Sequence, residues 1–208
     1  MARKKLTEDV EKEAVRERLL KSALDIFNEK GYAATSVREI VEAAGVTKPA
    51  LYYYFRSKEG IYMELFKEPF KLLEKMLNET VQEALSAQER IHHLFDSIFV
   101  LFTENLKTAR LMYSIYYGPP QGAPFFDFEG YHLKVREVVG LIVKDGIKSG
   151  EFREVDPNVF MWALNGALNF VLEEQLCHRS PQIELKGLSR ILDLIFDGLT
   201  NAKSKKKR

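Results

Sequence analysis

The sequence predicts an all-α protein built from two helical domains. Apolar residues recur every three or four positions in nearly every segment, which is the period of an amphipathic helix. Residues that cap helices, and glycines or prolines that end them, separate these segments. No stretch shows the sustained alternation of apolar and polar residues that indicates a β-strand. We therefore expect helices along the whole chain.

The first helix is expected from about Val10 to Lys30. Gly31 follows it, and glycine readily takes the left-handed conformation that ends many helices. The apolar stripe of this segment has the spacing i, i+3, i+4, i+7 and consists of Leu20, Ala23, Leu24 and Phe27.

The second helix is marked by signals at both of its ends. Thr35 or Ser36 can cap it, and Ser36 with Glu39 fits the Ser-x-x-Glu capping box. Gly45 ends it. Its apolar stripe consists of Val37, Ile40, Val41 and Ala44.

A third, short helix is expected from Thr47, as its cap, to Phe55. Pro49 is tolerated there because the first turn of a helix has no intrahelical partner for its N–H groups. Ser57 is expected to cap a fourth helix that runs towards Glu79.

The remaining helices have weaker boundaries. A loop is expected from Gly118 to Pro124, because three prolines and two glycines cannot continue a helix. Gly150 closes the seventh helix, and Asp156 with Pro157 opens the eighth as its cap and first residue. The expected ranges are approximately 86–106, 108–117, 125–149, 157–178 and 183–202.

Residues 36–55 have the spacing of a helix-turn-helix, two short helices joined by Gly45, Val46 and Thr47. At about 100° per residue, one side of the second helix gathers Leu51, Tyr54 and Phe55. The opposite side presents Pro49 and Tyr53, flanked by Ala50 and Tyr52, while Lys48 lies in the first turn. From Gly45 to Lys58 there are three basic residues and no acidic one. A basic and aromatic face without carboxylates indicates a nucleic-acid partner.

Charge along the chain is uneven. Residues 1–60 carry 12 Lys and Arg against 10 Asp and Glu, and residues 61–202 carry 14 against 20. The last six residues, from Lys203 to Arg208, add five basic side chains and no acidic one. Both ends are therefore basic around an acidic middle, a distribution that suggests a polyanion partner.

The stretch from Gly31 to Glu59 resembles the N-terminal signature of the TetR/AcrR family, and the resemblance covers about residues 14–62. The matching segments are Gly31-Tyr32, Thr35-Ser36-Val37-Arg38-Glu39-Ile40 and the run from Ala43 through Ala44-Gly45-Val46-Thr47-Lys48-Pro49-Ala50-Leu51-Tyr52-Tyr53-Tyr54-Phe55-Arg56-Ser57-Lys58 to Glu59. The resemblance implies a sequence-specific transcriptional regulator that binds double-stranded DNA, at a near-palindromic operator, as a homodimer. It also implies a small-molecule effector for the C-terminal domain.

The resemblance further implies DNA contacts for particular residues. Thr35 and Ser36 would hold a phosphate at a helix N-terminus, and Arg38 would reach the groove or the backbone. Phosphate or base contacts would come from Thr47, Lys48, Pro49, Ala50, Tyr52, Tyr53, Tyr54 and Lys58, with a flexible basic arm at Arg3, Lys4 and Lys5. The alternatives are that the aromatic run 52–55 is ordinary core and that Arg38 lies in a surface ion pair.

The C-terminal domain is rich in aromatic residues, which favours an apolar or aromatic effector. Ligand pockets are mostly apolar with a few polar groups that orient the ligand. Aromatic residues at helical spacing also form ordinary core, and that alternative stays open. The candidate ligand contacts are Phe99, Phe102, Met112, Tyr113, Tyr116, Phe126, Tyr131, His132, Trp162, Asn165 and Asn169.

The last two helices are the expected dimer interface. The eighth has small residues that permit close approach, and the ninth keeps a spacing of three and four between leucines and isoleucines. Two such helices from each subunit would form a four-helix bundle. Packing within one chain is the alternative. The interface candidates are Ala163, Gly166, Ala167, Leu188, Leu192, Ile195 and Leu199.

Several function classes are not supported by the sequence. There is no catalytic motif, and the neighbours His92-His93 and Cys177-His178 point about 100° apart on a helix, so neither pair suits a metal. We therefore expect no enzyme activity, no cofactor and no metal. The longest apolar runs are far too short to span a membrane, and one cysteine fits the reducing cytoplasm.

These expectations combine into one mechanism. Residues 1–60 form the DNA-binding domain, 61–202 the sensing and dimerisation domain, and 203–208 a basic disordered tail. An apolar effector would release a repressor from its operator, with Pro69 kinking or interrupting the fourth helix and helping to transmit the movement. An activator, an enzyme fused to a DNA-binding domain and a non-specific architectural DNA-binding protein are the alternatives.

Overall fold

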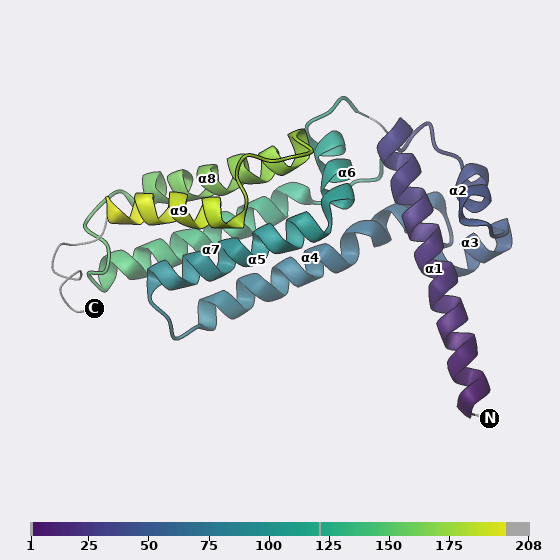
Figure 1. Ribbon diagram of the computed structural model, residues 1–208, viewed down its shortest axis with the longest axis horizontal. Coiled ribbons are helices and arrows are strands. Elements are labelled where there is room, and N and C mark those ends of the chain that lie inside the picture. The colour runs from purple at the N-terminus through teal and green to yellow at the C-terminus, as the bar shows by residue number, and fades with distance from the viewer. Residues whose placement is uncertain (1, 121, 199–208) are drawn as a thin grey trace. The chain divides into compact units, whose positions relative to one another are not determined.

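The structure is a computed structural model that describes residues 2–120 and 122–198, with side chains from residue 10 onward. This part of the chain contains nine α-helices (Figure 1), so the all-α prediction is confirmed. Their bounds are α1 Ala2–Lys30, α2 Val37–Ala44, α3 Lys48–Phe55, α4 Lys58–Gln82, α5 Ala87–Glu104, α6 Leu106–Tyr116, α7 Phe128–Lys148, α8 Pro157–Cys177 and α9 Leu185–Asp197.

The helices divide into two compact units. The first comprises Met1–Pro69 and Lys107–Phe126, and the second comprises Phe70–Leu106 and Asp127–Arg208. The first unit therefore holds α1, α2, α3, the start of α4 and nearly all of α6. The functional boundary at residue 60 stays a prediction.

The core of the first unit joins α1 to the helix-turn-helix. α1 packs on α2, and α2 packs on α3. An aromatic cluster lies behind them, in which the ring of Tyr32 is 5.3 Å from that of Phe27 and 5.2 Å from that of Tyr62, centre to centre. The buried apolar residues that α1, α2 and α3 contribute are Leu19, Ala23, Phe27, Ile40, Val41, Ala44, Leu51 and Phe55.

Local signals hold α2 and α3 in place. Ser36 is the cap of α2, and both hydrogen bonds of its capping box with Glu39 are formed, as predicted. Gly45 ends α2 in the left-handed region with φ of 63°, where residues with a Cβ are strained. Beyond α3, a Cβ on Gly60 would lie 1.9 Å from the carbonyl oxygen of Phe55, so only glycine allows this close approach of α4 to the end of α3.

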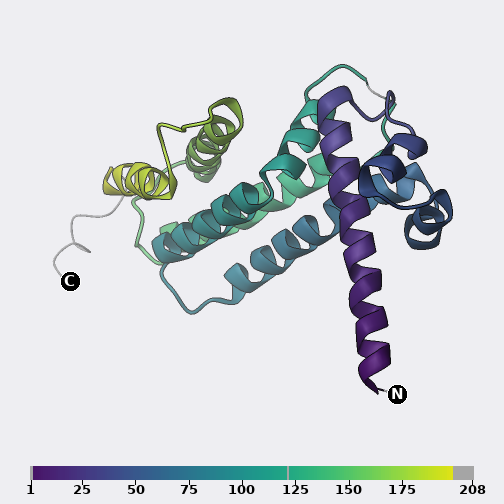
Figure 2. The same cartoon turned by 45° about the vertical axis from the view of Figure 1, so that its right-hand side comes forward.

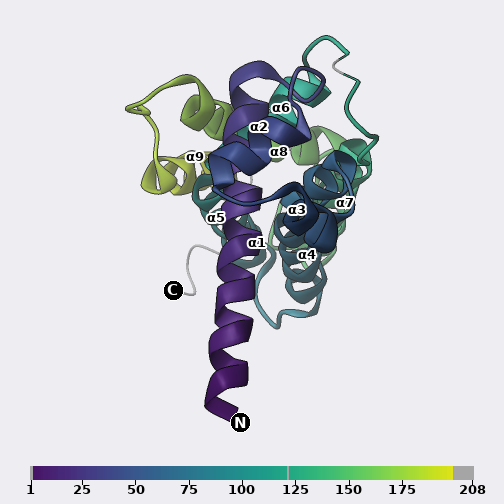
Figure 3. The same ribbon diagram turned by 90° about the vertical axis from the view of Figure 1, so that its right-hand side faces the viewer.

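The first helix is longer than expected, because it begins at Ala2 and not near Val10. Figures 1 and 3 both show its N-terminal half extending past α2 and α3. The charged residues of this half favour helix without needing a core, since oppositely charged side chains four apart support one another. The expected flexible arm is thus helical in its backbone, and the side chains of Arg3, Lys4 and Lys5 lie outside the described residues.

In the second unit α5, α7, α8 and α9 form a bundle, which Figure 2 shows from a second side. α7 packs on α8 and α5, and α9 packs on α5 and α8. Asp127 and Asp156 cap α7 and α8, and the Glu151 carboxylate caps α5 by accepting hydrogen bonds of 2.8 and 2.9 Å from the N–H groups of Ala87 and Gln88. The Asp127 cap explains why α7 begins three residues later than its apolar pattern indicated.

Three predicted dimer contacts belong to the core of the bundle. Leu188 and Leu192 are fully buried within the chain, and Ile195 packs against the same core. The leucine spacing in α9 therefore marks the inner face of an amphipathic helix. Leu188 and Leu192 are core residues of this chain, whereas an interface role for the half-buried Ile195 stays a prediction. Leu199 lies outside the described residues, as does the predicted basic tail.

The fourth helix is continuous through Pro69, so of the two expected effects, a kink or an interruption, the interruption does not occur. Proline lacks an N–H group, so the carbonyl of Leu65 is left without the hydrogen bond that residue 69 would otherwise donate. The division between the two compact units falls directly after Pro69. In the part of the chain that the structure describes, no helix is both long and apolar enough to cross a membrane.

Candidate nucleic-acid interface

The third helix has a buried side and an exposed side. Leu51 and Phe55, one helical turn apart, anchor it in the core of the first unit. Tyr52 and Tyr53 are exposed, and 71% of Tyr53 is accessible to solvent. Tyr54 is half-buried with its ring 4.9 Å from that of Tyr53, which agrees with its expected place near the core. Helix α3 therefore presents tyrosine hydroxyls to solvent from a firmly anchored backbone.

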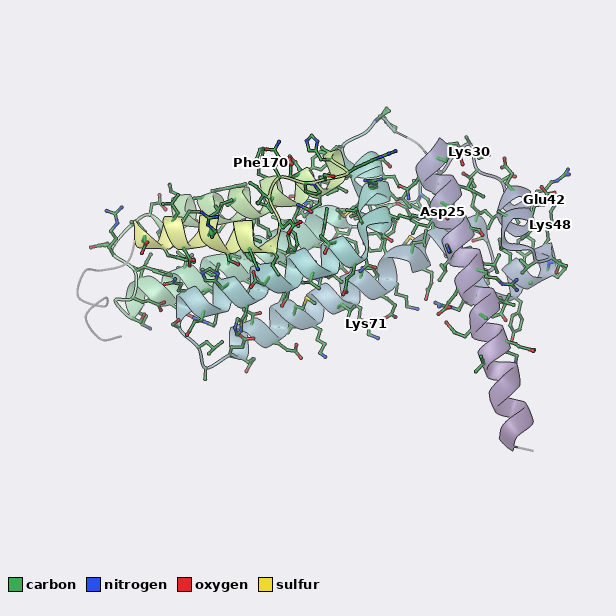
Figure 4. The ribbon with its side chains drawn as sticks, in the orientation of Figure 1. Asp25, Lys30, Glu42, Lys48, Lys71 and Phe170 are labelled. Carbon is green, nitrogen blue, oxygen red and sulfur yellow. The ribbon has the colours of Figure 1, made fainter. Side chains whose placement is uncertain are left out.

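The start of α3 adds a cation and a hydroxyl to this exposed side. Thr47 is the cap residue, but its side chain makes no capping hydrogen bond, so its exposed hydroxyl is available to another partner. Lys48 is exposed, and Figure 4 shows it at the outer edge of the α2–α3 pair. Pro49 is exposed and Ala50 half-buried, so a DNA base edge can approach the first turn closely.

The start of α2 offers a second place for a phosphate. The N–H groups of Val37 and Arg38 lie in the first turn, where a helix has no acceptors for them and its dipole favours an anion. Ser36 is exposed, and Arg38 pairs with Glu42 at 2.7 Å. That ion pair, the expected alternative for Arg38, is formed here, but an exposed pair of this kind is weak and gives way readily to a phosphate.

Two of the predicted phosphate contacts have internal partners. Thr35 is only 2% exposed, and its hydroxyl donates a 2.8 Å hydrogen bond to the carbonyl oxygen of Gly31. The Nζ atom of Lys58 donates hydrogen bonds of 2.8 Å to the carbonyl oxygens of Tyr32 and Thr35. The structure thus gives no support to a phosphate contact through either side chain.

Electrostatics at the base of α2 favour the folded arrangement. Hydrogen bonds from Lys30 and Ser36 lower the pKa of the Glu39 carboxyl to about 2. Burial lowers the pKa of the Lys58 ammonium, and burial together with the nearby Glu59 raises the pKa of Tyr32. Glu39 is therefore ionised at neutral pH and joins the ends of α1 and α2 through its ion pair with Lys30.

The predicted ligand contacts fall in both units. Met112, Tyr113, Tyr116 and Phe126 belong to the first unit, and the other seven belong to the second. Within the second unit Phe99 is buried, whereas Phe102, Tyr131 and His132 are half-buried. Burial lowers the pKa of His132, so its neutral form is favoured. Asn165 is buried and donates a 2.9 Å hydrogen bond to the carbonyl oxygen of Met161.

Two ligand candidates lie on an outer surface instead. Trp162 is 57% exposed on α8, with the guanidinium of Arg136 5.2 Å from its ring centre, and Asn169 is also exposed. The inner side of α8 is taken by Phe160, Leu164 and Leu168, so a side chain at position 162 points outward. Trp162 and Asn169 therefore lie outside the core of the single chain, and their role as ligand contacts stays a prediction.

An exposed apolar face on α8 was only partly recognised from the sequence. It comprises Val159, Trp162, Ala163, Gly166 and Phe170, with spacings of three and four residues, and we call it the α8 face. Figure 4 shows Phe170 on the outer side of α8. Ala163 and Gly166 were identified as interface residues, but Val159 and Phe170 were missed, although their helical spacing to Gly166 was readable.

A metal centre is not indicated. In residues 2–120 and 122–198, no three side chains of His, Cys, Asp or Glu come together in a way that could hold an ion. The exposed polar side chains of α3 and of its cap residue, Thr47, are a cation and hydroxyls, which suit a polyanion.

Comparisons with known proteins agree with this arrangement. Residues 19–65, which contain α2 and α3, match the profile of the bacterial regulatory proteins of the tetR family. The HTH-type transcriptional regulator YhgD of Bacillus subtilis is 26% identical over 189 residues, which are 88% of this chain and 95% of that protein. The HTH-type transcriptional repressor KstR2 of Mycobacterium tuberculosis is 30% identical over 139 residues, which are 65% of this chain and 68% of that protein.

A solved structure shares the fold as well. The crystal structure of the TetR family transcriptional regulator PfmR from Thermus thermophilus is similar, with a TM-score of 0.68 and 27% sequence identity. The match covers 88% of this chain and 100% of that chain. These relatives are transcriptional regulators and not enzymes. The chain belongs to the tetR family of bacterial regulatory proteins and is a DNA-binding transcriptional regulator.

Proposed function

We propose that the protein is a sequence-specific repressor that reads a near-palindromic operator with α3. The observation that carries this proposal is the exposed side of α3, where Lys48, Tyr52 and Tyr53 stand on a helix anchored by Leu51 and Phe55. No carboxylate lies between Gly45 and Lys58 to repel phosphates. The relative named KstR2 is called a repressor, which supports repression over activation.

The DNA contacts proposed from this geometry are the exposed and half-buried residues around α3 and the start of α2. Lys48 and Tyr53 reach phosphates or base edges, Thr47 and Ser36 supply hydroxyls, and Arg38 exchanges Glu42 for DNA. Pro49, Ala50 and Tyr52 line the same side, while Tyr54 contributes its hydroxyl from the edge.

The test is selection of bound sequences from random duplex DNA at a stated salt concentration. The wild type is compared with the double variant Lys48→Ala/Tyr53→Ala. We expect one near-palindromic site to be enriched by the wild type and lost by the variant. If neither protein enriches a site and both bind equally, α3 does not read sequence, and the architectural alternative takes its place. A defined footprint on the selected DNA distinguishes the two further.

We also propose that the protein is a homodimer joined through the α8 face. A Cβ built on Gly166 would meet no atom within 4 Å, so the space outside this glycine is open in the single chain. Glycine and alanine in the middle of an exposed apolar face allow two helices to approach closely. Leu194, 75% exposed, is a further exposed apolar side chain on α9, which packs on α8. To bind two half-sites of an operator, the two α3 helices of such a dimer must lie about 34–36 Å apart, the spacing of successive major grooves.

An apolar or aromatic effector is proposed to release the repressor. Within the second unit Phe99, Phe102, Tyr131 and the neutral form of His132 supply apolar surface and one uncharged polar group, and Asn165 adds a buried amide. A ligand that binds better to a conformer with a different spacing of its α3 helices lowers the affinity for DNA. Compounds that bind should raise the melting temperature and weaken operator binding together. A panel of apolar and aromatic compounds that changes neither would contradict the proposal.

Pro69 is proposed as a point where helix α4 can bend when the effector binds. The helix is continuous there but lacks one hydrogen bond, and the boundary between the compact units follows it. In Pro69→Ala the missing N–H returns, so we expect a smaller change in DNA affinity on effector binding. An unchanged response would remove Pro69 from the mechanism.

A further inference from the structure

Lys58 lies in the unit that contains the helix-turn-helix, but the N–H donors of its ammonium group are directed toward the interior of that unit. Both of its hydrogen bonds go to main-chain carbonyl oxygens, those of Tyr32 and Thr35, in the segment that joins α1 to α2. Its Nζ atom also lies 4.1 Å from the ring centre of Tyr32. In the part of the chain that is described, no carboxylate comes within ion-pair distance of this ammonium group.

The residues that receive these hydrogen bonds are themselves fixed. Tyr32 and Thr35 are both buried, and the N–H of Thr35 donates to the carbonyl oxygen of Tyr32 at 3.2 Å. The carbonyl of Tyr32 lies just beyond the C-terminus of α1, where a positive charge is favourable. Lys58 therefore adds a second hydrogen bond to the carbonyl oxygen of Tyr32 and supplies a donor for the carbonyl oxygen of Thr35.

This network ends at the start of α2. Ser36, which directly follows Thr35, is the cap of α2, and the free N–H groups of Val37 and Arg38 come next. Any movement of the Tyr32–Thr35 segment would move these groups relative to α3. Because Lys58 is also the first residue of α4, one side chain connects the beginning of α4 to the phosphate-facing end of α2.

We propose that Lys58 is a positioning residue, which fixes the N-terminus of α2 for DNA and does not itself bind a phosphate. This inference rests on the proposed DNA-binding function of α2 and α3. It departs from the sequence-based expectation, under which Lys58 was one more phosphate contact.

The salt dependence of DNA binding separates the two roles. A lysine that neutralises a phosphate releases a counterion, so its removal lowers the slope of log affinity against log salt by about one. We compare Lys58→Met with Lys48→Met, since methionine keeps an apolar stem of similar length in both. For Lys58→Met we expect at least tenfold weaker binding at every salt concentration with the slope unchanged. For Lys48→Met we expect a slope smaller by about one.

Amide hydrogen exchange on the full-length protein without DNA gives an independent readout. In Lys58→Met the amides of Thr35, Ser36 and Glu39 should exchange at least tenfold faster. The chain contains its own reference, because Ser86 and Glu89 form the same capping box at α5 without such a lysine, and their exchange should not change. The hydrogen-exchange measurement still tests the role of Lys58 if the protein selects no specific DNA site.

Two results would overturn the proposal. One is a slope that falls by about one in Lys58→Met with unchanged exchange in residues 35–39, which would make Lys58 a phosphate ligand. The other is unchanged affinity and unchanged exchange, which would leave Lys58 without a role. If Lys58→Met does not fold, Lys58→Gln, which keeps N–H donors without the charge, is measured in the same two ways. Under the proposal Lys58→Gln keeps the wild-type slope, and its amides at Thr35, Ser36 and Glu39 exchange faster than those of the wild type.

Discussion

Helices α3 and α8 both expose large aromatic side chains, but their surroundings differ. On α3 the exposed Tyr53 carries a hydroxyl and stands near Lys48, with no carboxylate on the helix. On α8 the exposed Phe170, 67% accessible, carries no polar atom and stands near Gly166 and Ala163. Exposure alone thus does not identify a partner. Polar atoms and cations beside the rings suit a polyanion, whereas small residues beside them suit a second helix.

The exposed side of α3 and the α8 face are also anchored to the rest of the chain in different ways. Helix α3 is short and is held in the core of the first unit by Leu51 and Phe55. Helix α8 is long and is anchored along its inner side by Phe160, Leu164, Leu168 and Leu172. A change on the outer side of α8 should therefore leave the fold intact, while changes at the ends of α2 and α4 should be transmitted to α3.

The largest effect is expected from Gly166→Arg. An arginine has room in the single chain, since nothing lies within 4 Å of a Cβ there, and arginine favours helix more than glycine does. It would place a charge in the middle of the proposed dimer interface. Analytical ultracentrifugation should show monomers, and operator affinity should fall by about 10²–10⁴, because the two half-sites are no longer linked.

Leu72→Arg is the control for Gly166→Arg. Leu72 is exposed on α4, whereas α8 packs on α5, α7 and α9, so a dimer with wild-type operator affinity is expected. If Gly166→Arg remains a dimer while its melting temperature is unchanged, the α8 face is not the interface.

A second comparison, on α9, tests whether the regularly spaced leucines of this helix pack inside the chain. Leu192 has no exposed surface and Leu194 is mostly exposed, although they are two residues apart. In the Gly166→Arg background, Leu192→Ala should lower the free energy of unfolding by about 2–5 kcal/mol and Leu194→Ala by less than about 0.5 kcal/mol. Urea unfolding measures both. Equal losses would mean that α9 does not pack as the structure shows.

Some features of this fold could be predicted from the sequence, and others could not. Local signals act within a few residues, so the Ser36–Glu39 capping box, the stop at Gly45 and the proline at the start of α8 could all be read directly. A helical stripe such as Leu188, Leu192 and Ile195 reports only that a face is apolar, because burial in the same chain and burial against a partner require the same spacing. The internal bonds of Lys58 join residues 23 and 26 positions apart, which no local pattern reveals.

On α3, Tyr53→Ala should weaken operator binding about tenfold or more, because a hydroxyl bonded to a charged phosphate is lost. Tyr117→Ala is its matched control, since Tyr117 is similarly exposed in the same unit but does not belong to the helix-turn-helix. Fluorescence anisotropy with the selected operator measures both affinities. A similar loss for Tyr117→Ala would show that exposed tyrosines act through general stability and not through contact with DNA.

The smallest effect is expected from Glu39, whose ion pair with Lys30 and capping bonds hold the ends of α1 and α2 together. Its pKa is lowered from 4.5 to about 2 in the folded protein, so its contribution to stability is complete above the unfolded value and is lost as the pH falls towards 2. Glu39→Gln removes this dependence, and the unfolding free energy of the wild type should therefore decline more steeply than that of the variant between pH 5 and about pH 2. Lys30→Met should reproduce part of the change, because the hydrogen bond from Lys30 is the largest cause of the lowered pKa. An NMR titration of the Glu39 carboxyl tests the cause directly: a midpoint near the ordinary value in the wild type would mean that the α1–α2 connection depends on Lys58 and the buried side chains alone.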